Sequence, residues 1–341
     1  MNEEIEIKKD EPEKFSKILE KVNNSSETNK KILLMGNRGV GKSSILNMIY
    51  FKSSQIDTYS LESTELISVN GINFIGINYN LIECGGKEKY KKFYFDNASK
   101  LFSKVNKLIF VIEAEDSGEN KEENNNNEIK DYNNSLDYYE KCLQYLEQYS
   151  PNCKVFVLIN KIDLINITRK KQVINKRKQE IRSRESNFEI KCFPTSIWEI
   201  HELKKSWGEI LINELNFDRI KNGLNLLKEN LKSRKIVIFE NFTFLKICSV
   251  NDDNFSDNFY DYFDEMIIMH IKNIYDNLQN EKLKEIEIDN ENNIILIKEF
   301  TPSTLIYLIF DKPCNHIELT KLNISLVKNE FIKILDNYQT N

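Results

Sequence analysis

One eight-residue loop constrains the fold of this chain more than any other feature. Residues 36–43 are Gly-Asn-Arg-Gly-Val-Gly-Lys-Ser, between the apolar run 31–35 and the helix-forming run 44–50. This is the P-loop pattern, in which glycines turn backbone amides toward phosphate, a lysine (Lys42) reaches the outer phosphates and a hydroxyl (Ser43) binds Mg²⁺. The following helix directs its N-terminal dipole at the phosphate. The alternative is a chance glycine-rich turn, which the strand before and the helix after count against. The residues expected to contact phosphate are Arg38, Gly39, Gly41, Lys42, Ser43 and Ser44.

A second loop predicts the base. Asn160-Lys161-Ile162-Asp163 follows the buried-strand run 155–159. The Asp163 carboxylate can accept both N–H groups that guanine presents and adenine lacks. We expect Asn160 to tie this loop to the P-loop, and the aliphatic stem of Lys161 to lie on the purine face. The pattern favours GTP or GDP over ATP, and it counts against an ATP-dependent P-loop kinase.

A third loop, Thr195-Ser196-Ile197-Trp198, follows the apolar strand run 190–193. Its backbone amides, including those of Ser196 and Ile197, are expected to face the carbonyl oxygen of guanine. Together with the loop at 160–163, it completes a predicted pocket for the guanine base.

Two segments between these loops are candidate switches. Leu61-Glu62-Ser63-Thr64 precedes a predicted β-hairpin of residues 65–69 and 72–83, and Thr64 is placed to close on Mg²⁺ and the γ-phosphate. The alternative for Thr64 is an ordinary threonine at the start of a strand. The hairpin ends in Glu83-Cys84-Gly85-Gly86, where the Gly86 amide is expected to face the γ-phosphate and Glu83 to reach Mg²⁺ through a water.

From residue 31 to the C-terminus the chain resembles the Rag family of small GTPases. The resemblance to the A/B branch lies in Cys84-Gly85-Gly86, Tyr138-Tyr139-x-x-Cys142-Leu143, Ser150-Pro151, Thr195 to Trp198 and Phe300 to Phe331. Leu61 to Thr64 and Arg38 are more like the C/D branch. Because the A/B-like segments are longer, we favour that branch.

The chain departs from the Rag pattern at two catalytic positions. Glu83 stands where the family has Asp, and Lys87 stands where it has the Gln that orients the attacking water. Arg38 lies at the P-loop position nearest the γ-phosphate, where its bulk can obstruct an incoming arginine or its charge can imitate one. We therefore expect slow GTP hydrolysis. A nucleotide-locked scaffold without meaningful hydrolysis is the main alternative, and a vesicle-trafficking small GTPase is a further one.

Length and composition predict two domains in the 341 residues. Residues 1–30 are expected to form a polar, flexible tail, in which one short amphipathic stretch (Phe15, Ile18, Leu19, Val22) allows a helical turn. Residues 31–216 are expected to form an α/β GTPase domain with a mostly parallel sheet, and residues 217–341 a linker helix and an α+β domain. The acidic, Asn-rich stretch 115–135 is expected to be a disordered insertion, with an acidic docking loop as the alternative. By resemblance, the C-terminal domain is a roadblock (longin-like) module that pairs with a second Rag-type GTPase of the opposite class.

Charge, cysteines and chain termini limit which partners and locations we expect. The net charge of −5 argues against nucleic-acid binding. The six cysteines lack metal-ligand spacing and are typical of reduced thiols in the cytoplasm. Residue 2 is Asn and the last residues contain no cysteine, so we expect no lipid anchor. The resemblance implies recruitment to the lysosomal or vacuolar membrane through a scaffold complex, and relay of amino-acid availability to target-of-rapamycin signalling.

Overall fold

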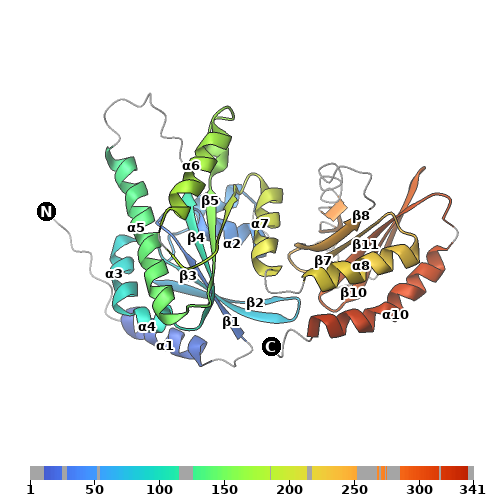
Figure 1. The fold of residues 1–341 in the computed structure, drawn as a ribbon, viewed down its shortest axis with the longest axis horizontal. Coiled ribbons are helices and arrows are strands. Elements are labelled where there is room, and N and C mark those ends of the chain that lie inside the picture. The colour runs from blue at the N-terminus through green and yellow to red at the C-terminus, as the bar shows by residue number, and fades with distance from the viewer. Residues whose placement is uncertain are drawn as a thin grey trace. The chain divides into compact units, whose positions relative to one another are not determined.

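The computed structural model describes residues 11–24, 29–51, 54–114, 126–184, 186–212, 217–251, 285–314 and 316–336, with 267, 268, 270–272 and 274 (Figure 1). The chain divides into two units. The first comprises residues 1–73 and 78–203, and the second comprises residues 74–77 and 204–341. Each unit contains one sheet, and each is described by itself below.

The first unit is built on a six-stranded sheet in the order β2-β3-β1-β4-β5-β6. Strand β1 lies between β3 and β4 and is parallel to both, and β4, β5 and β6 continue the parallel pairing. The alternation of strands and helices in the sequence predicts this arrangement, because parallel neighbours need a crossover connection. The strands are β1 (Asn29–Met35), β2 (Ile67–Phe74), β3 (Ile77–Cys84), β4 (Val105–Glu113), β5 (Lys154–Asn160) and β6 (Ile190–Pro194).

Helices surround this sheet, and alternate strand residues point to its two faces. Leu33 and Met35 belong to the same buried cluster as residues of α1, α3, α4 and α5, whereas Ile32 and Leu34 point to the other face, where α2 lies (Figure 1). The helices are α1 (Glu11–Asn23), α2 (Lys42–Tyr50), α3 (Glu88–Asp96), α4 (Ala98–Leu101), α5 (Asn126–Tyr149) and α6 (Lys170–Arg182), with short 3₁₀ turns η1 (Ile56–Ser60) and η2 (Ile162–Leu164). Helix α7 (Ile200–Ile212) begins in this unit, but its residues from 204 onward belong to the second unit.

The predicted flexible tail and the predicted disordered insertion both contain helix. In the predicted tail, α1 buries Phe15 and Leu19, which are one helical turn apart, in the core cluster of the first unit. In the predicted insertion, α5 begins at Asn126, so residues 126–135 are helical. Residues after 136 pack firmly, and helix propagation is easier than nucleation, so the polar residues before them extend the same helix. Residues 115–125 lie outside the described residues.

The second unit contains a five-stranded antiparallel sheet in the order β8-β7-β11-β10-β9. Its central strand is buried along almost its whole length, as the continuous apolar run 305–310 predicts. Helices α8 and α10 cover one face (Figure 1), and Ile267, Ile268 and Ile271 pack against the other. The elements are α8 (Phe217–Leu231), β7 (Lys235–Glu240), β8 (Lys246–Asn251), β9 (Glu285–Asp289), β10 (Asn293–Thr301), β11 (Thr304–Asp311) and α10 (Ile317–Asp336).

Two details of this unit differ from the sequence prediction or lie beyond it. The alternating residues 243–248 predict a strand over that range, but β8 runs from Lys246 to Asn251. The buried Glu240 carboxylate accepts hydrogen bonds from the Phe242 and Thr243 amides and holds residues 241–245 in a turn. Apolar residues at helical spacing over 259–278 predict a long helix, and most of that range lies outside the described residues. Among the described residues, no helix has the length and apolar character needed to cross a bilayer.

Candidate functional site

The predicted motifs follow the carboxyl ends of neighbouring strands in the first unit. The P-loop follows β1, the segment 84–86 ends β3, and the loops at 160–163 and 195–198 follow β5 and β6. Because these strands are parallel, their carboxyl ends lie at one edge of the sheet. Ligands bind at this edge in open α/β folds.

The P-loop has the backbone that its glycines permit. Gly36, Gly39 and Gly41 all have positive φ, of 141°, 82° and 97°, which other residues rarely adopt. A Cβ on Gly41 would lie 2.4 Å from the Asn160 side-chain nitrogen. Asn160 donates from that nitrogen to the Val40 carbonyl at 2.8 Å, so it ties the base loop to the P-loop.

Lys42 lies at the N-terminus of α2 and is buried. Its Nζ donates to the carbonyl oxygens of Gly36 (2.9 Å) and Asn37 (2.8 Å), so the ammonium group is held across the loop. Burial lowers the pKa of Lys42 to about 8, and the nearby negative charge of Glu83 partly opposes this effect. The ammonium is thus both positioned and poorly solvated, which strengthens its attraction to an anion.

Three oxygen-bearing side chains from separate segments meet beside Lys42. The hydroxyls of Ser43 and Thr64 are 3.0 Å apart, and Glu83 Oε1 accepts a hydrogen bond from each, at 2.5 and 2.9 Å. Glu83 is buried. Hydroxyl and carboxylate oxygens are the ligands that Mg²⁺ prefers, so this donor set fits the predicted metal.

Gly85 and Gly86 follow Cys84, and each packs closely against the backbone of another segment. A Cβ on Gly85 would lie 2.3 Å from the Glu65 carbonyl oxygen, and a Cβ on Gly86 would lie 2.3 Å from the Arg38 nitrogen. No side chain fits at either position without a backbone shift. The Gly86 backbone is therefore in direct contact with the P-loop, as a segment that senses the outer phosphate requires.

The base loops are joined through Asp163. Ser196 Oγ donates to the Asp163 carboxylate at 2.5 Å, and the hydroxyl of the fully buried Thr195 donates to Asn160 Oδ1 at 3.1 Å. The Ile162 amide also donates to the Thr195 carbonyl at 3.3 Å. The structure thus brings together two loops that the sequence analysis assigned to one pocket, and Ile197 lies partly exposed beside them.

Lys161 shows a partner that the sequence analysis missed. It adopts a left-handed conformation (φ 64°) and forms an ion pair with Glu113. Glu113 ends β4, the strand next to β5, and its register partner is Asn160. The sequence does show Glu113 as the acidic residue that ends the apolar run of β4. Pairing it with Lys161 requires knowing that β4 and β5 are neighbours in the sheet.

Arg38 and Lys87 are the two unusual cations of the site. The Arg38 side chain is exposed in the P-loop, and the Arg38 backbone nitrogen lies next to Gly86. Lys87 precedes α3 as its N-cap residue, and its Nζ lies 6.0 Å from the centre of the Tyr90 ring. Lys87 therefore follows Gly86 at the start of α3 and associates with an aromatic face.

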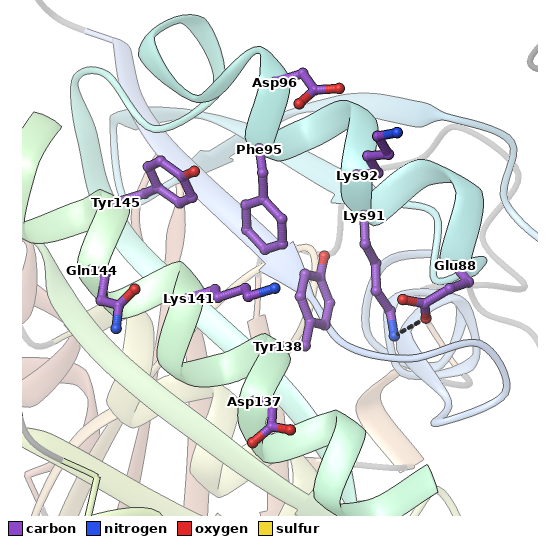
Figure 2. A pocket seen from close by; sticks show the side chains of 10 residues that line it. All are labelled: Glu88, Lys91, Lys92, Phe95, Asp96, Asp137, Tyr138, Lys141, Gln144 and Tyr145. Atoms are coloured by element: carbon purple, nitrogen blue, oxygen red, sulfur yellow. Dashed lines mark hydrogen bonds and ion pairs between the residues drawn. The ribbon is translucent and has the colours of Figure 1, made fainter. Parts of the chain in front are cut away.

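A pocket of about 380 Å³ lies between α3 and α5, and its lining includes none of the phosphate-loop and base-loop residues described above (Figure 2). Its floor includes Phe95 and Tyr145, whose rings stack with centres 5.2 Å apart, and the buried Tyr138. Lys91 lies over the Tyr138 ring and is paired with Glu88 at 2.7 Å. The rim carries lysines and carboxylates in equal number, so it favours neither sign of ligand charge.

These features define a class of protein. A parallel sheet with a P-loop after its first strand, a hydroxyl–carboxylate cluster beside the P-loop lysine and two joined base loops make a P-loop GTPase domain, and a roadblock-like α+β domain follows it. Residues 31–269 match the family model described as the Gtr1/RagA G protein conserved region. The chain belongs to this family, and its relatives favour the A/B-like branch.

Individual relatives extend over most of the chain. It is 29% identical over 323 residues to "GTP-binding protein GTR1" of Saccharomyces cerevisiae, covering 90% of this chain and 99% of that protein. It is 28% identical over 313 residues to "Ras-related GTP-binding protein A" of Dictyostelium discoideum, covering 90% and 98%. The match to "GTP-binding protein GTR2" of S. cerevisiae is 24% over 293 residues, covering 81% and 80%.

Proposed function

We propose that this protein is a guanine-nucleotide switch that binds GTP or GDP with Mg²⁺ and hydrolyses GTP slowly. The convergence of Ser43, Thr64 and Glu83 beside Lys42 carries the proposal. The base loops around Asp163 supply the other end of a nucleotide site. The printed names of the relatives, which are GTP-binding proteins, support the same assignment.

Each residue has a proposed role. Lys42 and the amides of Gly39, Gly41, Ser43 and Ser44 hold the phosphates, and Gly86 contacts the γ-phosphate. Ser43 and Thr64 hold Mg²⁺, with Glu83 acting through a water, and the metal neutralises charge on the phosphates. Asp163 reads guanine, supported by Asn160 and Lys161, and Ser196 and Ile197 line the base pocket.

Slow hydrolysis follows from Lys87. A water must be oriented for attack on the γ-phosphate, and a charged lysine can donate hydrogen bonds but cannot accept one. The position of the Lys87 Nζ near the Tyr90 ring supports this view. The same observation favours a second candidate function, a nucleotide-dependent scaffold whose hydrolysis is too slow to matter.

We also infer a partner for the second unit. Leu319, Leu322 and Leu326 follow one another at helical spacing on α10, and all three are more than half exposed. Such a stripe marks a surface for another protein. Matches to both GTR1-type and GTR2-type relatives support pairing with a second Rag-type GTPase of the opposite class. A membrane scaffold, a lysosomal or vacuolar location and a role in target-of-rapamycin signalling are further parts of the proposal.

Competition and single-turnover assays test the proposal together. The full chain should bind fluorescent GDP and lose it to GTP at micromolar concentration but not to ATP. Single-turnover hydrolysis of GTP should be well below the 1–10³ s⁻¹ that is typical of enzymes. Equal competition by ATP would refute the guanine site, and no measurable hydrolysis in the presence of Mg²⁺ would favour the scaffold.

A further inference from the structure

Two exposed aromatic rings, one from η1 and one from the loop 195–198, lie against each other. Tyr59 lies in η1, and Trp198 ends the loop 195–198. Their ring centres are 6.5 Å apart and their planes are inclined by 45°, which is within the range of attractive aromatic pairs. Tyr59 is 77% exposed and Trp198 is 48% exposed. The contact therefore adds little to the core, although it joins residues 139 positions apart.

Trp198 is fixed to the base end of the site. Its backbone N–H donates to Ser196 Oγ at 3.0 Å, and the same Oγ donates to the Asp163 carboxylate at 2.5 Å. Movement of the Trp198 backbone therefore disturbs the hydrogen bond between Ser196 and Asp163, which orients the Asp163 carboxylate.

Tyr59 is fixed to the phosphate end. The 3₁₀ turn η1 packs against α2, the helix that begins at Lys42. Five residues after Tyr59, the Thr64 hydroxyl meets Ser43 and Glu83. Within η1, Thr58 Oγ1 donates to the Gln55 carbonyl at 2.6 Å, so the turn that carries Tyr59 has an internal hydrogen bond.

We propose that Tyr59 and Trp198 form a latch that closes residues 54–64 against the loop 195–198 and slows the release of bound nucleotide. The inference rests on the proposed guanine site. The Trp198 ring is tied to Asp163 through Ser196, and Tyr59 precedes Thr64. Residues 54–64 therefore cannot part from the loop 195–198 unless the rings separate. Opening of the latch thus precedes nucleotide escape past this segment.

The latch should respond to the γ-phosphate. Thr64 is expected to engage the metal and the γ-phosphate in the triphosphate state, and this engagement holds the residues that follow Tyr59 in place. Coupling between two contacts is reciprocal. Loss of the ring contact should therefore speed the release of a GTP analogue more than the release of GDP.

The test is stopped-flow release of fluorescent GDP and a fluorescent, non-hydrolysable GTP analogue from the full chain. Tyr59→Ala and Trp198→Ala should each raise the release rate about two- to tenfold, the change expected from the loss of one aromatic pair. The double variant should release nucleotide no faster than the faster single variant. Tyr59→Phe keeps the ring and should keep the wild-type rate.

Two controls separate the latch from general loss of apolar surface. Ile56→Ala removes another exposed side chain of η1, and Ile167→Ala removes one from the stretch after the loop 160–163. The two residues are 73% and 86% exposed. Both variants should release nucleotide at the wild-type rate.

The outcomes distinguish the latch from the nucleotide site. Wild-type release rates in Tyr59→Ala and Trp198→Ala, or additive effects in the double variant, would overturn the latch and leave the site intact. If the wild-type protein binds neither nucleotide, the proposed function itself fails. An equal acceleration of GDP and analogue release would contradict the coupling to Thr64.

Discussion

The two sheets of this protein place their polar residues differently. In the first unit, parallel strands end together, so Glu83, Glu113 and Asn160 lie at one edge, where the candidate site is found. In the second unit, antiparallel strands alternate in direction, and a buried carboxylate such as Glu240 instead holds a local turn, accepting hydrogen bonds from Phe242 and Thr243. Strand direction thus gathers polar groups at one edge in the first sheet and leaves them in separate local turns in the second.

The largest expected effect tests whether the first sheet alone carries nucleotide recognition. Asp163→Ala should weaken GDP binding by about 3–6 kcal/mol, because two charge-assisted hydrogen bonds of about 1.5–3 kcal/mol each are lost. Isothermal titration calorimetry measures the change. Asp96→Ala, which removes an exposed carboxylate of α3, is the control and should bind normally. An unchanged affinity in Asp163→Ala would show that the base is read elsewhere.

A core substitution in the second sheet tests the converse. Leu308 is fully buried in the central strand β11, so Leu308→Ala should lower the free energy of unfolding of this unit by about 2–5 kcal/mol. Leu322→Ala, on the exposed stripe of α10, should change it by less than about 0.5 kcal/mol. Urea denaturation measures stability, and GDP titration should give the wild-type affinity for both variants. Loss of GDP binding in Leu308→Ala would mean that the two units depend on each other.

A third prediction concerns how complete the first unit is as a catalyst. Lys87→Gln should raise single-turnover GTP hydrolysis about tenfold, since glutamine can both donate to and accept from the attacking water. Lys89→Gln is a matched control, because Lys89 also lies over the Tyr90 ring, at 5.0 Å. If both variants keep the wild-type rate, another group positions the water and the explanation from Lys87 is wrong.

A fourth expected effect, spread over several pH units, lies at the opposite end of the first sheet. Lys31, near the amino end of β1, is buried, and its Nζ donates to Asn23 Oδ1 and to the Lys100 and Ser103 carbonyls. Burial nevertheless lowers the pKa of Lys31 to about 7. An unfolded lysine keeps its ordinary, higher pKa, so above pH 7 the unfolded state binds more protons and stability rises with pH.

Lys31→Met should remove this contribution. Between pH 7 and 10 the free energy of unfolding of the wild type should rise relative to that of the variant, by at most about 1.4 kcal/mol per pH unit. Urea denaturation at several pH values measures the two slopes. Lys30→Met, at the neighbouring and less buried position, should keep the wild-type slope. Identical slopes in wild type and Lys31→Met would show that Lys31 keeps its ordinary pKa in the folded state.

Local patterns predicted much of the fold because they encode backbone requirements. The P-loop needs glycines at positive φ, and Gly39 and Gly41 have it. The alternating apolar runs correctly predicted a mostly parallel sheet followed by a smaller α+β domain. The sequence also predicted that Asn160 ties its loop to the P-loop, and Asn160 donates a hydrogen bond to the Val40 carbonyl.

Most contacts between distant segments could not be predicted. Phe15 and Leu19 indicated a possible helical turn, but the surface that buries them is made by other elements, so residues 1–30 were predicted to be a flexible tail. The Lys161–Glu113 pair depends on β4 and β5 being neighbours, and Tyr59 meets Trp198 only after the chain has folded. Such pairs leave no periodic signal, because each partner alone resembles an ordinary surface residue.

The cysteines have a practical consequence for experiments with fluorescent dyes. Cys84, Cys142, Cys153 and Cys248 are buried, and burial raises the pKa of Cys84 to about 12, so these thiols should resist maleimides in the folded protein. The two remaining thiols, Cys192 and Cys314, are partly exposed, and one lies in each unit. The natural sequence therefore offers one attachment point in each unit, and energy transfer between two dyes could follow the distance between the units as nucleotide binds.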